Sequence, residues 1–331
     1  MSGAKNRTVI VALTARGGAL AQRIAAALPG AQVHGREGRV EGAGVTFDET
    51  TAHLQALFAQ GRPIVGLCAA GILVRALAPL LAGKQEDPPL VAVAEDGSAV
   101  VPLLGGHRGA NDLARSIAAA LGVAPAITTA GDLRFGVALD EPPPGWRLAN
   151  PEHAKDFTAR LLAGENVKLE GAAPWLAAGA LPFADEAPLV LQATIEAVEG
   201  APGRLVYHPP QLALGVGCAR GCPPEELQAL LCESLAAAGL SSQAVAGIYS
   251  LALKSDEPAV HALAESLSVP ARFFDAEALK AEAPRLATPS EVVEREVGVP
   301  GVAEAAALAA AGPEGCLILP KRKSANATCA V

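Results

Sequence analysis

The fold is decided by the stretch from residue 63 to residue 82, PIVGLCAAGILVRALAPLLA. Its first part, 63–68, is a short apolar run with the length and composition of a buried strand. Gly71 ends that run, and residues 72–82 have the apolar spacing of a helix that follows directly. The stretch is therefore a strand followed at once by a helix, which is the repeating unit of an α/β fold.

The same unit recurs before this stretch. Residues 8–13 (TVIVAL) form a β-branched run typical of a strand, and Gly17 and Gly18 turn the chain into an Ala-rich helix over 19–28. A further helix is predicted over 49–60. Strands that alternate with helices at this interval predict a doubly wound, mainly parallel sheet.

After the opening stretch, the sequence predicts a hairpin. Two apolar runs, 90–94 and 99–104, flank residues 95–98 (EDGS), whose residue types favour a tight turn. A helix capped by its first residue is expected over 111–121, and residues 125–129 are expected to form the last strand of this domain.

Composition shifts near residue 140, where prolines cluster between 140 and 151. We therefore expect an N-terminal α/β domain over 1–140, a linker and small middle module over 141–210, and a second α/β domain over 211–331. Strands again alternate with helices in that last part. The expected fold class is α/β throughout.

Charge and composition exclude several classes of protein. The formal net charge of −8 lacks the basic footprint that broad nucleic-acid binding needs. The longest uncharged apolar run, between Arg62 and Arg75, is shorter than the ~18–20 residues that span a bilayer. The six cysteines are irregularly spaced, so we expect free thiols and a cytoplasmic protein with neither a signal peptide nor a membrane span.

Polar residues stand next to the ends of the predicted strands, where open α/β sheets bind ligands. Gly71 and Arg75 open the helix after the strand at 63–68, and an arginine there can reach an anionic group. Gly106, His107 and Asn111 follow the second hairpin strand, where glycine permits close backbone approach and histidine can transfer protons near neutral pH. Three of these residues also have an explanation without a ligand. Arg75 can be a solvent-exposed helix residue, His107 an ordinary loop residue and Asn111 a helix cap.

Thr128, Thr129 and Asp132 end the last predicted strand of the first domain with two hydroxyls and a carboxylate. Such side chains are also common in turns. Because a doubly wound sheet gathers strand ends at one edge, we expect these residues to converge with Arg75 and His107 on one cleft.

A glycine-rich segment lies in the second α/β domain. Gly215, Gly217, Cys218 and Gly221 precede a helix, but their spacing departs from the dinucleotide fingerprint. Cys218 and Cys222 have no second Cys/His pair nearby, which disfavours structural zinc. A glycine-lined ligand loop is the better interpretation, and residues alone indicate two α/β modules with a cleft suited to anions.

These segments resemble, in order and over nearly the whole chain, the CbiG family of cobalt-precorrin-5A hydrolases in cobalamin (vitamin B12) biosynthesis. The C-terminal part resembles the half of that family that also occurs alone as the CobE protein. The segments that carry the resemblance are 71–79 (GILVRALAP), 103–114 (LLGGHRGANDLA), 125–132 (PAITTAGD), 215–221 (GVGCARG), 253–258 (LKSDEP), 289–293 (PSEVV), 300–304 (PGVAE) and 319–323 (LPKRK).

The resemblance implies opening of the δ-lactone of a cobalt-tetrapyrrole and release of acetaldehyde to give cobalt-precorrin-5B. On this basis His107 is the candidate general acid/base and Arg75 the ligand of a carboxylate or oxyanion. Thr128, Thr129 and Asp132 are candidates for orienting water, with Asp132 also the alternative base. Gly71, Gly106 and Asn111 are assigned to substrate binding.

From the second domain, Lys254, Lys321, Ser290 and the loop at 215–221 are assigned to gripping the macrocycle and its carboxylates. The resemblance implies no cofactor and no protein-bound catalytic metal, because cobalt arrives within the substrate. The expected partner is the tetrapyrrole, cobalt-loaded or metal-free, and other enzymes of the pathway are further candidates.

Two other functions compete with this one. The first is a tetrapyrrole-binding or carrier protein without turnover, which would use the same binding residues. The CobE-like half on its own is the model for this alternative. A nicotinamide-dependent oxidoreductase is disfavoured, because the dinucleotide fingerprint is missing.

Overall fold

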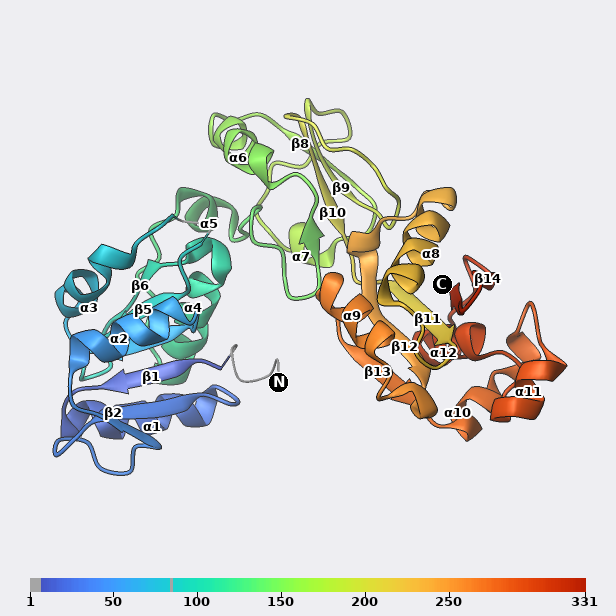
Figure 1. The fold of residues 1–331 in the computed structure, drawn as a ribbon. Coiled ribbons are helices and arrows are strands. Elements are labelled where there is room, and N and C mark those ends of the chain that lie inside the picture. The colour runs from blue at the N-terminus through green and yellow to red at the C-terminus, as the bar shows by residue number, and fades with distance from the viewer. Residues whose placement is uncertain (1–6, 84–85) are drawn as a thin grey trace. The chain divides into compact units, whose positions relative to one another are not determined.

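The computed structural model describes residues 7–83 and 86–331 and divides the chain into two compact units, with the boundary between Glu141 and Pro142. The first unit holds one sheet and the second unit holds two (Figure 1). No helix in the described part of the chain is both long and apolar enough to cross a membrane. All six cysteines are free thiols, as expected.

The first unit is built on a six-stranded sheet in the order β3-β2-β1-β4-β5-β6. The first five strands are parallel and β6 is antiparallel to β5, which confirms the doubly wound, mainly parallel α/β fold. The strands are β1 (Val9–Ala12), β2 (Gln32–Arg36), β3 (Val45–Phe47), β4 (Ile64–Leu67), β5 (Leu90–Val93) and β6 (Val100–Leu104).

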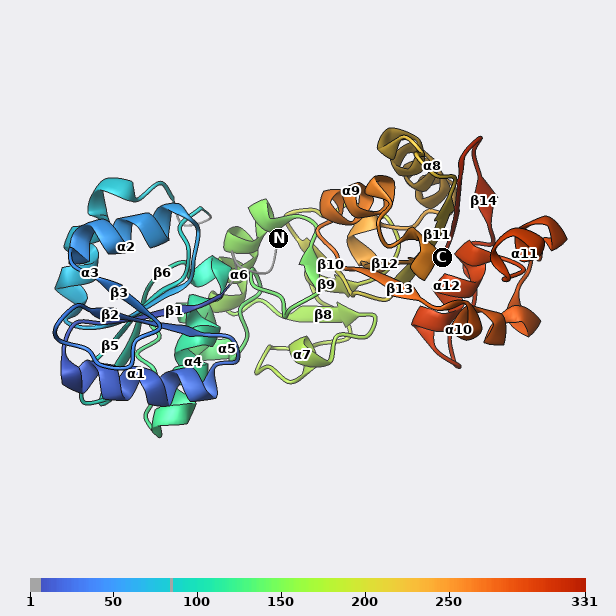
Figure 2. The ribbon, with the colours of Figure 1, turned by 60° about the horizontal axis from the view of Figure 1, so that its bottom comes forward.

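Helices cover both faces of this sheet (Figure 2). Successive side chains of a strand point to opposite faces, so Ile10 packs in one core and Val9 in the other. The central strands are apolar at every position because both of their faces are buried. The helices are α1 (Ala15–Ala27) and α4 (Ala110–Leu121) on one face, and α2 (Thr50–Ala59) and α3 (Ala70–Leu77) on the other.

The β5–β6 hairpin determines where the later loops lie. Its register pairs Leu90 with Leu104 and Val93 with Val100. Leu104, the last residue of β6, therefore lies beside the first residue of β5. We call the side where the parallel strands end the carboxyl edge, and the side where they begin the amino edge. The loop after β6 is thus at the amino edge.

Three local predictions for this unit are wrong. Residues 125–129 are not a strand: Pro125 makes a single bridge with Val100, because proline lacks an amide hydrogen for a longer ladder. Asn111 is not a helix cap, since α4 begins at Ala110 after Gly109, whose φ of 92° only glycine adopts readily. Gly17 lies inside α1, which begins earlier than expected because Thr14 caps it.

The strands β2 and β3 were not expected from the sequence. β2 (QVHGR) mixes polar residues and glycine with a single aliphatic side chain, so it lacks the apolar run of a buried strand. Pairing with β1 on one side and β3 on the other makes it a strand. Both strands follow turns or loops, and β3 is only three residues long.

The second unit contains a four-stranded sheet in the order β7-β10-β9-β8, with α6 (Ala154–Leu162) and the short α7 (Pro174–Ala177) beside it in the chain. β9 pairs in parallel with β8 and β10, whereas β7 is antiparallel. The strands are β7 (Arg147–Leu148), β8 (Val167–Glu170), β9 (Leu189–Ala193) and β10 (Arg204–His208).

A five-stranded sheet, ordered β13-β12-β11-β15-β14, forms the rest of the second unit. α8 (Pro224–Ala237) and α9 (Pro258–Ser266) pack in one core, whereas α10 (Ala276–Ala281) and α12 (Val302–Ala311) pack in another. Figure 2 shows these two pairs on opposite sides of the strands. The strands are β11 (Leu212–Cys218), β12 (Val245–Leu251), β13 (Ala271–Phe274), β14 (Arg322–Lys323) and β15 (Ala327–Ala330).

Candidate functional site

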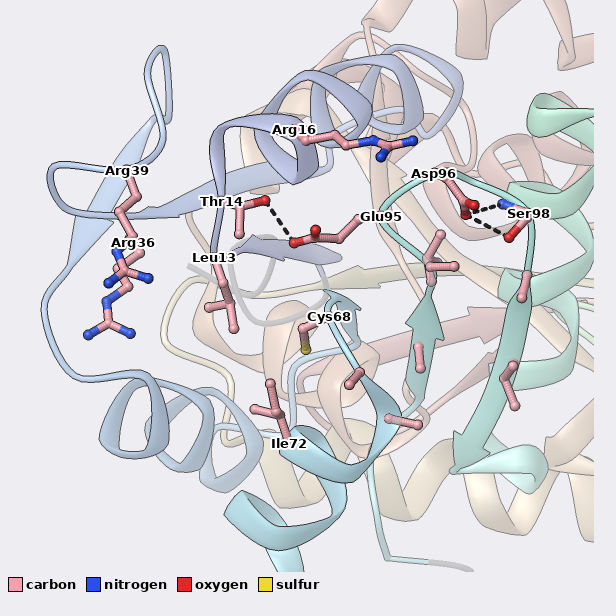
Figure 3. Close-up of a pocket in the computed structure, with 17 residues that line it drawn as sticks. Leu13, Thr14, Arg16, Arg36, Arg39, Cys68, Ile72, Glu95, Asp96 and Ser98 are labelled. Carbon is pink, nitrogen blue, oxygen red and sulfur yellow. Dashed lines mark hydrogen bonds between the residues drawn. The ribbon is translucent and has the colours of Figure 1, made fainter.

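A cavity of about 860 Å³ opens at the carboxyl edge of the first unit's sheet (Figure 3). It lies where the chain order reverses, since β1 has β2 on one side and β4 on the other. Doubly wound sheets bind ligands at this point, because the loops from the two sides diverge there and leave a crevice. The ends of β1, β2, β4 and β5 all contribute lining residues.

A carboxylate is fixed in the middle of this cavity. The Thr14 hydroxyl donates to Glu95 Oε1 at 2.7 Å and accepts from Gly17 N at 3.1 Å, so one side chain both caps α1 and orients Glu95. A Cβ added at Gly17 would lie 3.6 Å from the same Glu95 oxygen. A carboxylate so placed can accept a proton from water.

Cys68, at the end of β4, also lines the cavity but is not a nucleophile. Burial raises the pKa of the Cys68 thiol to about 11, and the negative charge of Glu95 adds to this effect. The thiol is therefore protonated at neutral pH, and the thiol form is a poor nucleophile.

Three arginines line the cavity at its rims. Figure 3 shows Arg36 and Arg39 on one side of Glu95, whereas Arg16 extends toward Asp96 on the other side. Hydrogen bonds from Ser98, together with the charge of Arg16, hold the pKa of Asp96 below its ordinary value. The cavity thus combines cationic rims with one central carboxylate.

Two of the residues predicted from the sequence lie next to this cavity. Arg75 is exposed on α3, and its guanidinium folds back along the helix, so that a Cβ added at Gly71 would lie 3.2 Å from Arg75 Nη1. The residues on either side of Gly71, Ala70 and Ile72, line the cavity. Arg75 is therefore held at the carboxyl edge without lining the cavity itself.

Three other predicted residues come together at the amino edge. Asn111 is 4% exposed, and its Nδ2 donates to Thr129 Oγ1 at 3.1 Å. A Cβ added at Gly106 would lie 3.9 Å from that same nitrogen. The neighbouring Gly105 has a φ of 70°, and a Cβ there would be 2.7 Å from the Pro88 carbonyl group. Thr128 is exposed beside this cluster.

The expected convergence on one edge is therefore wrong. Arg75 is at the carboxyl edge on the α3 face, but the loop containing His107 follows the antiparallel strand β6 and lies at the amino edge. The side chains of His107 and Asp132 lie outside the described part of the structure, so their roles stay predictions.

In the second unit, Gly215 and Gly217 have a packing role. A Cβ at Gly215 would lie 1.9 Å from Ala303 O, and one at Gly217 would lie 2.9 Å from Thr328 Oγ1. The absence of a side chain at Gly215 lets α12 pack directly against β11, and its absence at Gly217 leaves room for Thr328 on β15. Close packing therefore explains both residues without a ligand.

Cys218, Gly221 and Lys254 gather where β11 and β12 end. Burial raises the pKa of Cys218 to about 11, although the Lys254 charge opposes the shift. Gly221 has a φ of 71°, and its amide donates to Glu257 Oε1 at 2.9 Å. Arg220 pairs with Asp256 at 2.6 Å, which ties the two loops together.

Lys321 and Ser290 lie around a buried carboxylate that the sequence did not single out. Glu304 is 1% exposed and accepts from Lys321 N at 2.9 Å and from Thr288 Oγ1 at 2.8 Å. Burial alone would raise the pKa of Glu304, but these and two backbone hydrogen bonds lower it. Lys321 Nζ donates to Thr288 O at 2.8 Å, and Ser290 N donates to Pro300 O.

Sequence reasoning missed the lining residues Arg16, Arg36, Arg39 and Glu95. Arg16 stands directly after a predicted strand, and Glu95 opens the predicted hairpin turn, so both positions were available as signals. Arg36 and Arg39 follow β2, which has no apolar run, and their place in the cavity depends on strand pairing.

Comparison with known proteins assigns the chain to a family. Residues 52–132 match the family description "Cobalamin synthesis G N-terminal", and 212–331 match "Cobalamin synthesis G C-terminus". A cobalt-precorrin-5A hydrolase from Salmonella typhimurium is 34% identical over 287 residues, which cover 81% of this chain and 82% of the relative. The chain belongs to the CbiG family.

Two further relatives support this membership in the CbiG family of cobalamin synthesis. A cobalt-precorrin-5A hydrolase from Priestia megaterium is 29% identical over 304 residues, covering 84% of this chain and 80% of the relative. Protein CobE from Sinorhizobium sp. is 48% identical over 120 residues, covering 36% of this chain and 78% of the relative.

Proposed function

We propose that this protein is a cobalt-precorrin-5A hydrolase, which opens the δ-lactone of a tetrapyrrole and releases acetaldehyde to give cobalt-precorrin-5B. The observation that carries this proposal is the 34% identity to the Salmonella typhimurium hydrolase over 82% of that protein. Cobalt is part of the substrate in this proposal, so the chemistry needs no resident metal and no separate cofactor.

The reaction needs a base and a cationic group. Water adds to the lactone carbonyl carbon while a base removes its proton, and the acyl–oxygen bond breaks as the departing alkoxide takes up a proton. A nearby guanidinium stabilises the oxyanion. The base then deprotonates the new alcohol, the carbon–carbon bond breaks to release acetaldehyde, and the electron pair left on the macrocycle is protonated.

Two assignments of the base compete. The sequence motif favours His107, and this stays a proposal. The geometry of the carboxyl edge favours Glu95, because Glu95 lines the cavity and Thr14 fixes its orientation. We propose Glu95 as the base and Arg75 as the ligand of a substrate carboxylate beside the cavity.

A carrier without turnover is the second candidate function. What supports it is that Protein CobE, 48% identical over 36% of this chain, is a relative whose name carries no hydrolase activity. In that case the chain would bind the tetrapyrrole without converting it.

Incubation of the full chain with cobalt-precorrin-5A tests the function. We expect acetaldehyde to appear in step with loss of the substrate, measured with alcohol dehydrogenase and NADH. Heat-denatured protein is the control for spontaneous lactone opening. Tight binding of the substrate with no acetaldehyde above that control would leave the carrier function in place of the hydrolase.

A further inference from the structure

Arg36 and Arg39 form an uncompensated cationic rim on the cavity. They lie at the end of β2 and in the loop after it, and both line the same side of the cavity (Figure 3). Within residues 7–83 and 86–331, no carboxylate lies within ion-pair distance of either one. The adjacent Glu37 is engaged elsewhere, because a hydrogen bond with Asp48 raises its pKa.

Two positive charges on one side of a cavity, without a carboxylate partner, favour binding of an anion there. Arginine binds carboxylates through paired N–H donors, so two arginines that line the same side of a cavity can bind one carboxylate together. Arg16 at the other rim can bind a second anionic group of the ligand, although its charge also acts on Asp96 and lowers the pKa of that carboxyl. The cavity therefore suits a ligand with several separated negative groups.

The space between the rims is largely apolar. Leu13, Ile72 and Val101 line it together with small alanine side chains. A volume of about 860 Å³ exceeds what a single carboxylate or phosphate fills and lies in the range of sites for whole organic ligands. A flat apolar body with anionic groups at its periphery matches this arrangement of walls and rims.

The start of α1 argues against a phosphate ligand. Nucleotide sites of doubly wound sheets place phosphate on the free amides of the first helix. Here the Gly17 amide is already bonded to the Thr14 hydroxyl, and the Glu95 carboxylate occupies the space beside it. A phosphate at that position would meet a negative charge and would lose this donor.

We infer that this cavity is the binding site for the carboxylate-bearing edge of the tetrapyrrole. Arg36 and Arg39 bind one carboxylate, Arg16 binds another, and the apolar lining contacts the macrocycle edge. This inference rests on the proposed function for its choice of ligand. It assigns substrate binding to three arginines outside the segments that carry the family resemblance.

Binding of uroporphyrin to the full chain tests the inference, since every peripheral substituent of this stable tetrapyrrole ends in a carboxylate. Titration is followed by the absorbance and fluorescence of the porphyrin. The double variant Arg36→Gln/Arg39→Gln should weaken binding about tenfold or more, which corresponds to loss of one charge-assisted contact. Arg16→Gln should weaken it less. Arg23→Gln, on the exposed side of α1 and outside the cavity, is the matched control and should bind normally.

Two results would overturn the inference: unchanged uroporphyrin affinity in a double variant with normal circular dichroism, or displacement of uroporphyrin by equimolar inorganic pyrophosphate. The second would indicate a phosphate site. Turnover separates this failure from failure of the proposed function. If cobalt-precorrin-5A yields acetaldehyde with an unchanged KM in the double variant, the hydrolase stands and the site does not. If binding depends on the arginines but no acetaldehyde forms, the site stands and the hydrolase does not.

Discussion

The two edges of the first unit's sheet have opposite characters. The carboxyl edge holds an open cavity of about 860 Å³ with cationic rims and a fixed carboxylate. The amino edge holds a glycine loop closed around Asn111, whose amide is satisfied by Thr129. The distinctive glycine-rich motif is thus at the amino edge, where its side chains bond to one another. The space for a ligand is at the carboxyl edge.

This difference shows that a glycine-rich motif can be required by backbone geometry and need not mark a ligand site. Gly105 and Gly109 both have positive φ angles, and a Cβ at Gly105 would collide with Pro88. Those constraints account for glycine at these positions without any substrate. The cavity, by contrast, is lined by residues from four strand ends that share no local motif.

The largest expected effect is on turnover, and it shows at which edge of the sheet the catalytic base lies. Glu95→Gln should lower acetaldehyde release about 100-fold or more, because general base catalysis typically contributes ~10²–10⁴-fold. His107→Ala should retain turnover within about tenfold on the same scale. Both variants are compared by initial rates and checked by circular dichroism. The reverse pattern would move the reaction to the amino edge and restore His107 as the base.

Acid should weaken the carboxyl edge through β2. Burial, with the charges of His53 and Arg62, lowers the pKa of His34 to about 4, and His34 Nδ1 lies 2.9 Å from His53 Nε2. His34 therefore binds a proton more readily in the unfolded chain than in the folded one. Its contribution to the free energy of unfolding is complete above pH ~6.5 and is lost progressively as the pH drops toward 4. At pH 5 the loss should be about 2 kcal/mol.

Hydrogen exchange of peptides from β2, corrected for the intrinsic effect of pH, measures this loss. His34→Gln should remove most of the dependence, because glutamine does not titrate. Since β2 also carries Arg36, porphyrin binding should weaken over the same pH interval. Equal protection of β2 at pH 7.5 and pH 5 would contradict the assigned cause.

A smaller effect is expected at the side of the cavity. Arg75→Ala should raise KM about fivefold to tenfold and leave kcat nearly unchanged, because a lost carboxylate contact weakens ground state and transition state alike. Steady-state kinetics with cobalt-precorrin-5A measure both constants, with Arg23→Ala as the exposed control. A fall in kcat with constant KM would instead place Arg75 on the developing oxyanion.

The smallest effect belongs to the amino edge. Asn111→Ala should lower the free energy of unfolding by about 1–2 kcal/mol, because it removes a buried hydrogen-bonded amide, and should leave turnover largely intact. Thr129→Val removes the partner oxygen, so a double-mutant cycle by chemical denaturation isolates the pair. A loss of turnover larger than the loss of stability would show that this cluster contacts substrate.

The sequence by itself determined the alternation of strands and helices, the apolar central strands and the β5–β6 hairpin, because these follow from local periodicity and turn chemistry. Only the tertiary structure decided which edge each loop occupies. The antiparallel return of β6 carries the His107 loop away from Arg75, and the pairing of the polar strand β2 with β1 brings Arg36 and Arg39 to the cavity. Strand pairing joins residues distant in sequence, so no local pattern of residues encodes it.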